Sequence, residues 1–530
     1  MSAFPRITEK LPFLSSLVVA GIFVLFFYFI PWTGFETNDD ALMMHISSGS
    51  LSGLGSPFLV YSHYYLCKLL VWLYGSFPGV NFYPLFLFFS HWVALTSLLY
   101  FCLQSPGKNT LHFCLFFLLP VETLLLCNLQ FTSTAIMVAF GGVMLMINAV
   151  RQRSTIHLLL SALLLTLGAM IRWESFLLAA AVGIFPIALE FYRKRWRTLL
   201  VVIPFFVVIV VVIRHAHLKA YAERVGETIV NPVTELQMRR IMDFPAKISI
   251  SELKQAGWSL NDYQICREWF WADPEFFQGT NMKNLEQAIK FDFSLSGKIV
   301  SLLHFVKTNI GFVAAFLILF YFLPEVVDKK QFRTTALPIL FILISFFMLE
   351  RLLPRVVIPV LTCSLLLLIA NAEQFKIPLQ PITFSICTVL LLIQLYFSAE
   401  RNATNKQNFE STFSCLKKYD DHLIVNKNSC MNLEGCPIQA DPRYYSPGNF
   451  LWVDVLAGYP VYNEVLQKRG INNLMKAIWE RPDVMVLADQ VDDIVCYAKE
   501  HYQEEIGQTV VERDVNKGVH LFHLWRKNNW

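Results

Sequence analysis

Three carboxylates stand close together in the stretch FETNDDALMMHISSG: Glu36, Asp39 and Asp40. The stretch follows directly on the apolar run LPFLSSLVVAGIFVLFFYFIPW, so the acids lie at a lipid boundary. Clustered carboxylates raise each other's pKa, and loss of water raises it further, which suits proton abstraction or binding of a divalent cation. The letters TNDDALMMHISSG predict a short helix capped by Asn38 or Asp39 and ended by Gly49. If its first turn extends back, the three acids share one face; otherwise Asp39 only caps the helix and Asp40 is solvated.

Charged residues also interrupt later apolar runs. A charge in such a place costs about 2.5–3.5 kcal/mol and usually faces a cavity or a partner. We therefore expect the following residues to line a substrate cavity or bind an anion: Glu122 in LLPVETLLLCN, Arg172 and Glu174 in AMIRWESFLL, and Glu350, Arg351 and Arg355 in FMLERLLPRVVIP. Plain salt bridges, Arg172 with Glu174 and Glu350 with Arg351, are the alternative.

Two further stretches carry side chains suited to a sugar or a lipid phosphate. SPFLVYSHYYLCKLLVWLYGSFPG places His63, Tyr64 and Lys68 on an amphipathic segment that would lie along the membrane interface. Lys68 would contact a lipid phosphate. A lysine whose apolar stem lies along the membrane surface, with its ammonium group in water, fits equally well. His63 is more simply an interfacial residue than a base. In REWFWADPEFF, Trp269 and Trp271 would stack on acceptor sugars or belong to an interfacial aromatic belt.

The composition indicates the elements that must hold these residues. The chain has 530 residues, of which 55% are hydrophobic and 16% charged, and its mean hydropathy is +0.47. These values are typical of a polytopic membrane protein, and a net charge of +4 gives no indication of nucleic-acid binding. About eleven apolar runs approach the length of a membrane-spanning helix: residues 12–31, 82–104, 111–128, 131–150, 155–171, 174–191, 198–213, 298–323, 335–350, 355–371 and 378–398.

The basic residues orient these helices. If the N-terminus is cytoplasmic, alternate connections carry Lys108, Arg151, residues 193–197, residues 328–333 and Lys376, all on one side. Three larger segments then lie outside the membrane: residues 32–81, 214–297 and 399–530. The last alternates β-like and amphipathic stretches, which predicts a small α/β or α+β domain after a transmembrane domain of residues 1–398. Three of its cysteines, Cys415, Cys430 and Cys436, would form a disulfide if the compartment is oxidising.

Acids that activate a hydroxyl, together with arginines that hold a phosphate at the same membrane face, suit sugar transfer from a lipid phosphate. The segment NDDALMMHISSG…GLGSPFLVYSHYYLCKLLVWLYGSFPGVNFY resembles bacterial members of the GT-C superfamily of glycosyltransferases, strongest over residues 30–90. This resemblance implies a polytopic helical bundle, a polyprenyl-phosphate-linked sugar donor and a soluble outer domain. It also implies that the first-loop catalytic acid is Asp39 or Asp40, and it assigns no role to Glu36. Members differ in whether this acid works with a metal, so Asp39 and Asp40 would also hold Mg²⁺ or Mn²⁺ if one is used.

The expected activity is therefore glycosyl transfer to a glycan or another hydroxyl acceptor at the outer face of a bacterial plasma membrane. Asp39 or Asp40 would be the base, and Arg351, Arg355 and Arg172 would neutralise the departing polyprenyl phosphate. The expected partners are the lipid-linked donor, a glycan or lipid-linked acceptor and membrane lipids. Two alternatives remain open. An O-antigen-type polymerase or ligase would carry its essential charges in residues 214–290, and a flippase or transporter would carry them on broken helices near the bilayer midplane.

Overall fold

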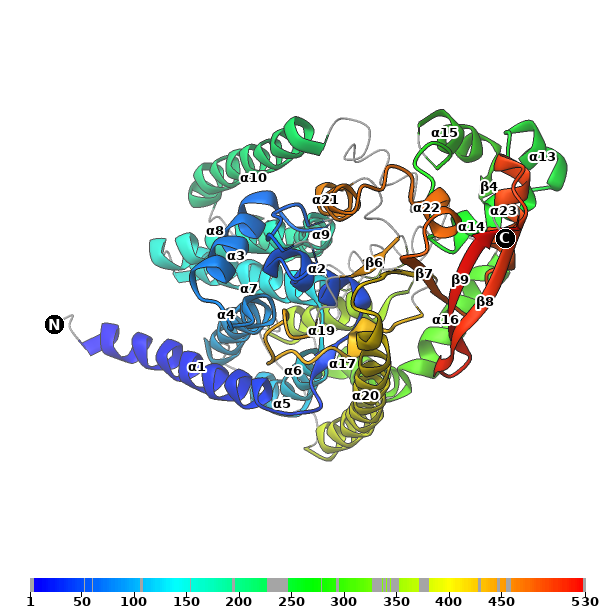
Figure 1. The fold of residues 1–530 in the computed structure, drawn as a ribbon. Coiled ribbons are helices and arrows are strands. Elements are labelled where there is room, and N and C mark those ends of the chain that lie inside the picture. Colours follow the sequence, from blue (N-terminus) through cyan, green and yellow to red (C-terminus); the bar gives the residue numbers. More distant parts are fainter. Residues whose placement is uncertain are drawn as a thin grey trace.

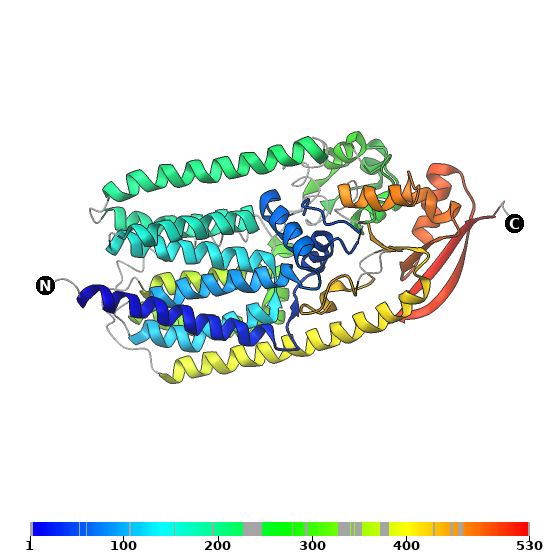
Figure 2. The same cartoon turned by 60° about the vertical axis from the view of Figure 1, so that its left-hand side comes forward.

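The computed structural model describes residues 4–51, 53–59, 61–104, 108–152, 154–192, 196–225, 246–277, 279–291, 295–326, 352–370, 381–427, 430–445, 449–453 and 459–527, and positions 336, 340 and 344. A bundle of helices forms one end of the molecule (Figure 2). It contains α1 (Phe4–Tyr28), α4 (Phe82–Gln104), α5 (Lys108–Phe113), a π-helical turn (Cys114–Leu118), α6 (Leu119–Cys127), α7 (Phe131–Gln152), α8 (Thr155–Ile171), α9 (Trp173–Tyr192), α10 (Trp196–Val225), α16 (Leu295–Thr308), α17 (Ile310–Val326), α19 (Pro354–Ala370) and α20 (Pro381–Leu416).

Within the described residues, four helical segments are long and apolar enough to cross a membrane: Phe82–Gln104, Thr110–Cys127, Phe131–Gln152 and Ile382–Tyr419. Shorter apolar helices accompany them: Pro12–Tyr28, Thr155–Ile171, Trp173–Ala188 and Pro354–Ile369. The chain is thus a multi-pass membrane protein, and the predicted fold class, a mainly α bundle with a small C-terminal sheet domain, is confirmed. The apolar run 335–350 lies outside the described residues apart from three isolated positions.

One predicted helix is wrong. The run 298–323 consists of two helices, α16 and α17, bent by 97° around Asn309. Gln394 of α20 satisfies backbone groups that the bend releases, because its side chain donates to the carbonyl of Thr308 (3.0 Å) and accepts from the amide of Gly311 (3.3 Å). A polar side chain from another helix therefore replaces the lost helical hydrogen bonds, as backbone within a membrane requires.

Helix α20 runs without a break from the bundle into the C-terminal domain, as Figure 2 shows in yellow. The domain boundary predicted at residues 398 and 399 therefore falls inside this helix, and the following sheet begins at β5 (Leu423–Asn426). Helices α1, α10 and α20 all begin at the end of the bundle that is remote from the C-terminal domain (Figure 2).

The C-terminal domain is built on a five-stranded sheet in the order β6-β5-β7-β9-β8, in which β5 is parallel to β6 and β7 and β9 is antiparallel to β7 and β8. The remaining strands are β6 (Phe450–Trp452), β7 (Val484–Ala488), β8 (Ile506–Asn516) and β9 (Val519–Arg526). The helices of this domain are α21 (Pro460–Lys468), α22 (Leu474–Glu480) and α23 (Asp492–Tyr502). Two 3₁₀ turns, Lys417–Tyr419 and Leu433–Gly435, accompany them. Alternation along the strands divides the sheet: Val484 and Val486 pack with α22 and α23, whereas Met485 and Leu487 belong to the core of the bundle.

The middle outer segment folds together with this domain. It forms β3 (Ala246–Lys247), α13 (Ile250–Gln255), α14 (Leu260–Arg267), α15 (Gly279–Ala288) and β4 (Lys290–Phe291). Asp273 is buried and accepts from the hydroxyls of Tyr497 (2.9 Å) and Tyr502 and from the amide of Asn473 (3.1 Å). Two segments that are separate in the sequence thus share one core.

The cysteines of the tail are free thiols in this structure. Cys436 is buried, and Cys415 and Cys430 are half-buried, each without a disulfide partner. The expectation of a disulfide among them is therefore wrong. In place of a covalent link, the tail is held by its hydrophobic core and by hydrogen bonds to the first outer loop.

Candidate functional site

The first outer loop holds the acids at the end of the bundle facing the C-terminal domain (Figure 2). After α1, the two-residue strand β1 (Gly34–Phe35) pairs in parallel with β2 (Asn128–Leu129), and α2 (Asn38–Ser48) begins at once. The predicted helix is confirmed, with Thr37 and not Asn38 or Asp39 as its N-cap. Gly49 ends it with φ of +77°, where a Cβ would lie 2.7 Å from the amide nitrogen of Gly55.

Asp40 is fully buried between three elements. Its Oδ1 accepts from the hydroxyl of Tyr83 on α4 (3.0 Å) and from the backbone amide of Phe131 at the start of α7 (3.0 Å). Its Oδ2 accepts from the hydroxyl of Thr37 (3.0 Å). Burial raises the pKa of Asp40 to about 8, although the amide of Phe131 and the two hydroxyls act against the rise. Asp40 therefore anchors α2 to the bundle.

Asp39 has a different environment although it is the next residue. Its side chain is half-buried and makes no hydrogen bond or ion pair with any other residue that the structure describes. A carboxylate that is accessible and has no partner can accept a proton from a bound hydroxyl, provided that it lies within hydrogen-bond reach. Asp39 is accessible and has no partner among the described residues, whereas Asp40 is buried and hydrogen-bonded.

Arg172 lies directly beside the amide that binds Asp40. Its guanidinium stands over the rings of Phe131 (4.9 Å to the centroid) and Tyr61 (5.2 Å), and Nη1 donates to the hydroxyl of Thr132 (2.6 Å). Glu174, which is more than half exposed, approaches Arg172 Nε at 3.7 Å. The first turn of α7 thus connects one predicted acid with one predicted arginine.

A second charged cluster surrounds Glu36. Burial raises the pKa of Glu36, whereas the charges of Arg355 and Arg401 lower it and Glu434 raises it. The same two arginines lower the pKa of Glu434, which burial raises. Arg401 is exposed on α20 and donates to the side chain of Asn128 (2.8 Å), while Nε of the half-buried Arg355 has no hydrogen-bond partner among the described residues. Glu36 therefore faces this cluster and not the environment of Asp40.

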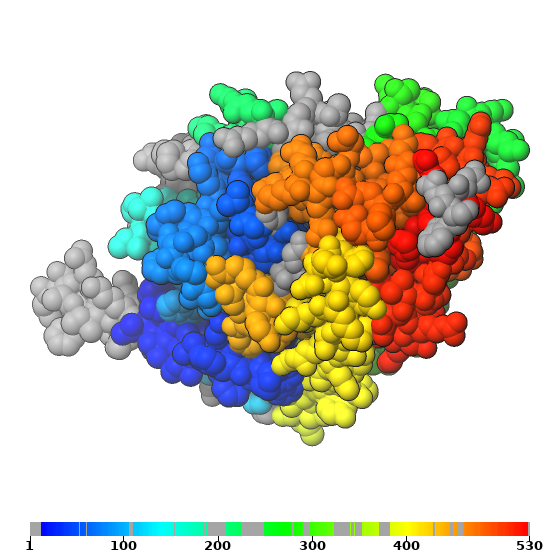
Figure 3. Space-filling view, in the orientation of Figure 1, coloured from blue at the N-terminus to red at the C-terminus, as the bar shows by residue number. Residues whose placement is uncertain are grey.

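A short segment of the tail closes over the first loop. We call residues 430–440 the strap; it contains the 3₁₀ turn Leu433–Gly435. The side chain of Asn38 accepts from the amides of Leu433 (2.8 Å) and Glu434 (3.2 Å), and Asn81 donates to the carbonyl of Ile438 (3.0 Å). In Figure 3 the strap, coloured amber, lies against the blue surface of the first loop. The C-terminal domain thus contributes Glu434 to the cluster at Glu36.

Glu122 lies inside the bundle. Glu122 and His91 are both fully buried. Nδ1 of His91 lies 2.7 Å from a carboxylate oxygen of Glu122, and Nε2 of His91 lies 3.0 Å from the hydroxyl of Thr134. This arrangement connects α4, α6 and α7. Glu122 therefore occupies an interhelical pair and not the wall of an open cavity.

The residues of the amphipathic segment divide between two faces of α3 (Tyr64–Ser76). His63 and Tyr64 are buried against α10, where His63 Nε2 bonds the carbonyl of Ile213 (2.9 Å) and the amide of Tyr64 donates to His217 (3.2 Å). Lys68 is exposed on the opposite face together with Leu69 and Trp72. That face has the composition of a helix lying in the membrane interface.

The two tryptophans of the middle segment do not form an open platform. Trp271 is only 3% exposed and donates to the carbonyl of Cys266 (3.2 Å) in the core shared with the tail, so it offers no ring face to a sugar. Trp269 is half-buried, with φ of +60°. Glu350 and Arg351 lie outside the described residues.

The first-loop acids do not fit a bridging cation. Both oxygens of Asp40 already accept hydrogen bonds from a hydroxyl or an amide, and a cation would have to displace these donors. Among the described residues, Asp39 and Asp40 join no group of three ligands.

Sequence reasoning missed Arg401 and Glu434, which the structure brings to Glu36. Arg401 follows the last apolar run, and its position on a continuing helix gave no signal in the sequence. Tyr83 was missed for a similar reason, because its hydroxyl lies within an apolar helix.

No protein-family model and no curated protein matches the chain. The structure of ArnT from Cupriavidus metallidurans in the apo state aligns with 95% of this chain and 97% of its own length, at 12% identity and a TM-score of 0.41. This likeness covers the bundle and the C-terminal domain.

Proposed function

We propose that the protein is a membrane glycosyltransferase that moves a sugar from a polyprenyl-phosphate donor to a hydroxyl of a glycan or lipid-linked acceptor at the outer membrane face. The observation that carries this proposal is the accessible, unpartnered Asp39 on a helix that Asp40 fixes in place. Glu36, three residues earlier, faces Arg355 and Arg401. The proposed base is thus three residues along the chain from an acid that faces two arginines.

In the proposed reaction, Asp39 accepts the proton of the acceptor hydroxyl. The hydroxyl oxygen bonds to the anomeric carbon, and the bond from that carbon to the donor's phosphate oxygen breaks. The electron pair stays on the phosphate, whose negative charge increases by one. Asp40 does not touch the substrate; it orients α2 through Tyr83 and Phe131.

Arg355 and Arg401 are proposed to bind the phosphate as its charge grows. A guanidinium forms bidentate hydrogen bonds with phosphate oxygens, and Nε of Arg355 has no partner among the described residues. Arg172, which stands over the ring of Phe131, is proposed to support the same negative charge.

The alternatives gain less support. A polymerase or ligase would use charges of the middle segment, but Asp262, Glu268 and Asp273 are bonded to His501, Lys427 and Tyr497 of the tail. A transporter would carry charges at a helix break. The side chains that bond at the break between α16 and α17 are the uncharged Thr308, Asn309 and Gln394.

The test compares Asp39→Asn with Asp40→Asn in purified protein reconstituted in lipid nanodiscs, supplied with a panel of polyprenyl-phosphate-linked hexoses and pentoses. Loss of a general base typically costs about 10²–10⁴-fold in rate, so we expect that loss for Asp39→Asn. Asp40→Asn keeps the shape of an anchor and should stay within about tenfold of wild type. Full activity of Asp39→Asn would rule out its role as the base.

A further inference from the structure

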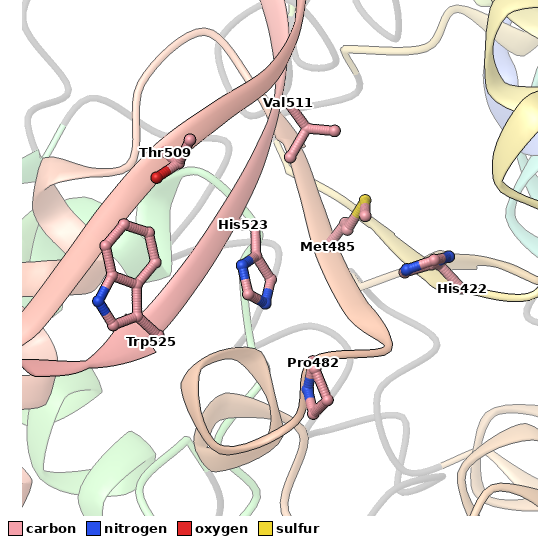
Figure 4. Close-up of a pocket in the computed structure, with 7 residues that line it drawn as sticks. All are labelled: His422, Pro482, Met485, Thr509, Val511, His523 and Trp525. Atoms are coloured by element: carbon pink, nitrogen blue, oxygen red, sulfur yellow. The ribbon is translucent and has the colours of Figure 1, made fainter. Parts of the chain in front are cut away.

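A cavity lies on the sheet of the C-terminal domain, on the face opposite the one that packs with α22 and α23. Its volume is about 690 Å³, within the usual range for small-molecule sites. Figure 4 shows the side chains that line it: His422, Pro482, Met485, Thr509, Val511, His523 and Trp525. They come from β7, β8 and β9 and from the turns before β5 and β7. The strap joins β5 and β6, so the cavity lies toward the opposite edge of the sheet.

Two cross-strand pairs build the floor of this cavity. Gly507 lies opposite Trp525, and Thr509 lies opposite His523. A Cβ at position 507 would stand 2.6 Å from Cε2 of Trp525, so the indole lies across the glycine and needs its missing side chain. The rings of Trp525 and His523 stack with centroids 6.0 Å apart. The indole is therefore held in a fixed orientation.

Several polar side chains line the cavity. Nε2 of His523 is buried and has no hydrogen-bond partner among the described residues. Burial lowers the pKa of His523, and the neighbouring His422 lowers it further, so its imidazole is neutral near pH 7. His422 uses Nδ1 to bond Asp421 (2.6 Å), which leaves its Nε2 for another partner. Thr509 adds a hydroxyl on the exposed side of β8.

We propose that this cavity binds a neutral glycan segment, as an acceptor subsite of the glycosyl transfer proposed above. Sugars combine an apolar CH face, which stacks on an aromatic ring, with hydroxyl groups at its rim. Trp525 supplies the ring, and Thr509, His422 and His523 supply hydrogen-bonding groups around it. No lysine or arginine is among the lining residues, so the cavity offers an anionic ligand no permanent cation. An acyl chain would leave the buried Nε2 of His523 without a partner.

The test measures binding directly, without catalysis, by saturation-transfer NMR on full-length protein in lipid nanodiscs. Maltoside detergents are avoided because their head group is itself a neutral disaccharide. The probes are maltotetraose, chitotetraose, mannotetraose and galactotetraose. We expect at least one of them to bind, with affinity about tenfold lower in Trp525→Ala.

Two further variants separate binding from folding. Gly507→Ala keeps the indole but displaces it, and should weaken binding by a similar factor. Val510→Ala is the matched control, because Val510 lies between Thr509 and Val511, opposite Phe522 on the other face, and is about as exposed as Val511 (36% and 37%). This control should bind like wild type.

Several results would overturn the proposal: no binding of any neutral probe, equal binding by Trp525→Ala, or tighter binding of tetragalacturonic acid or spin-labelled stearate to the same residues. Binding of a neutral probe to a wild-type protein that shows no transfer activity on any donor would reject the proposed function and keep the glycan site.

Discussion

At the scale of single residues, two neighbouring acids have different physical roles. Asp40 is enclosed and accepts three hydrogen bonds, whereas Asp39 is half-buried and makes none within the described structure. Position in the chain does not separate them, because both lie in the first turn of α2. Burial and donors decide which one can act as a base.

The first residue-scale prediction concerns pH and stability. The pKa of Asp40 is about 8 in the folded protein, against about 3.9 in an unfolded chain. The folded state thus holds a proton that the unfolded state releases, and the stability gained this way is complete below about pH 4 and lost as the pH rises through about 8. Asp40→Asn keeps the acceptor oxygen and has no proton to lose. Its melting temperature should fall less than that of wild type between pH 5 and 8.5 in a thermal scan; equal slopes would contradict the assignment.

The second residue-scale prediction concerns the arginines. If Arg355 and Arg401 hold the departing phosphate, Arg355→Gln and Arg401→Gln should each lower kcat/KM for the donor by about 10- to 100-fold. Replacement by lysine keeps the charge without the bidentate geometry and should restore part of the activity. Arg443→Gln is the control, since Arg443 pairs with the nearby Asp441 on the surface. A comparable loss in this control would indicate a general effect of charge.

At the scale of elements, α2 is positioned by parts of the chain that are distant in sequence. Strand β2, which precedes α7, pairs with β1, and the strap donates two backbone hydrogen bonds to the side chain of Asn38. The helix is only 11 residues long and would be marginal by itself. Its stability therefore comes from these tertiary contacts.

Asn38→Ala tests this dependence. The change leaves the amides of Leu433 and Glu434 without their acceptor in α2 and should destabilise the strap by about 1–2 kcal/mol. Hydrogen exchange at these two amides should become faster, while exchange in α23 stays unchanged. Asn38→Asp keeps an acceptor oxygen and serves as the control. Unchanged protection in Asn38→Ala would mean that other contacts hold the strap.

At the scale of the whole molecule, the middle segment and the tail form one domain that covers the acid-bearing end of the bundle. Lys427 illustrates the link, since its buried ammonium lies 3.3 Å from Glu268 of the middle segment and 2.7 Å from Asp493 of the tail. Both segments must therefore lie on the same side of the membrane, as the basic connections predict.

Cys496 provides a measurement of this orientation. It is the one exposed cysteine of the eleven in the chain, on α23 of the C-terminal domain. If the domain is extracytoplasmic, a membrane-impermeant maleimide should label wild type in intact spheroplasts, and Cys496→Ser should lose most of the label. Labelling that requires permeabilised cells would place the domain in the cytoplasm and reverse the proposed topology.

The sequence by itself determined the bounds of most helices, the helix from Asn38 to Ser48 and the alternation of strands in the tail. These features depend on the hydrophobic pattern of neighbouring residues and on residues that end a helix, such as Gly49. Both can be recognised in a short stretch of sequence. The sequence also placed the acids beside a membrane boundary, because charge is costly in lipid whatever the fold.

Only the tertiary structure decided how these residues are used. Asp40 is bonded to an amide 91 positions away, and Asn38 to an amide 395 positions away. The burial of Trp271, the approach of Arg401 and Glu434 to Glu36 and the bend at Asn309 have the same origin. Each depends on contacts between distant segments, and a carboxylate becomes an anchor or a candidate base only when the fold has set its burial and its hydrogen-bond donors.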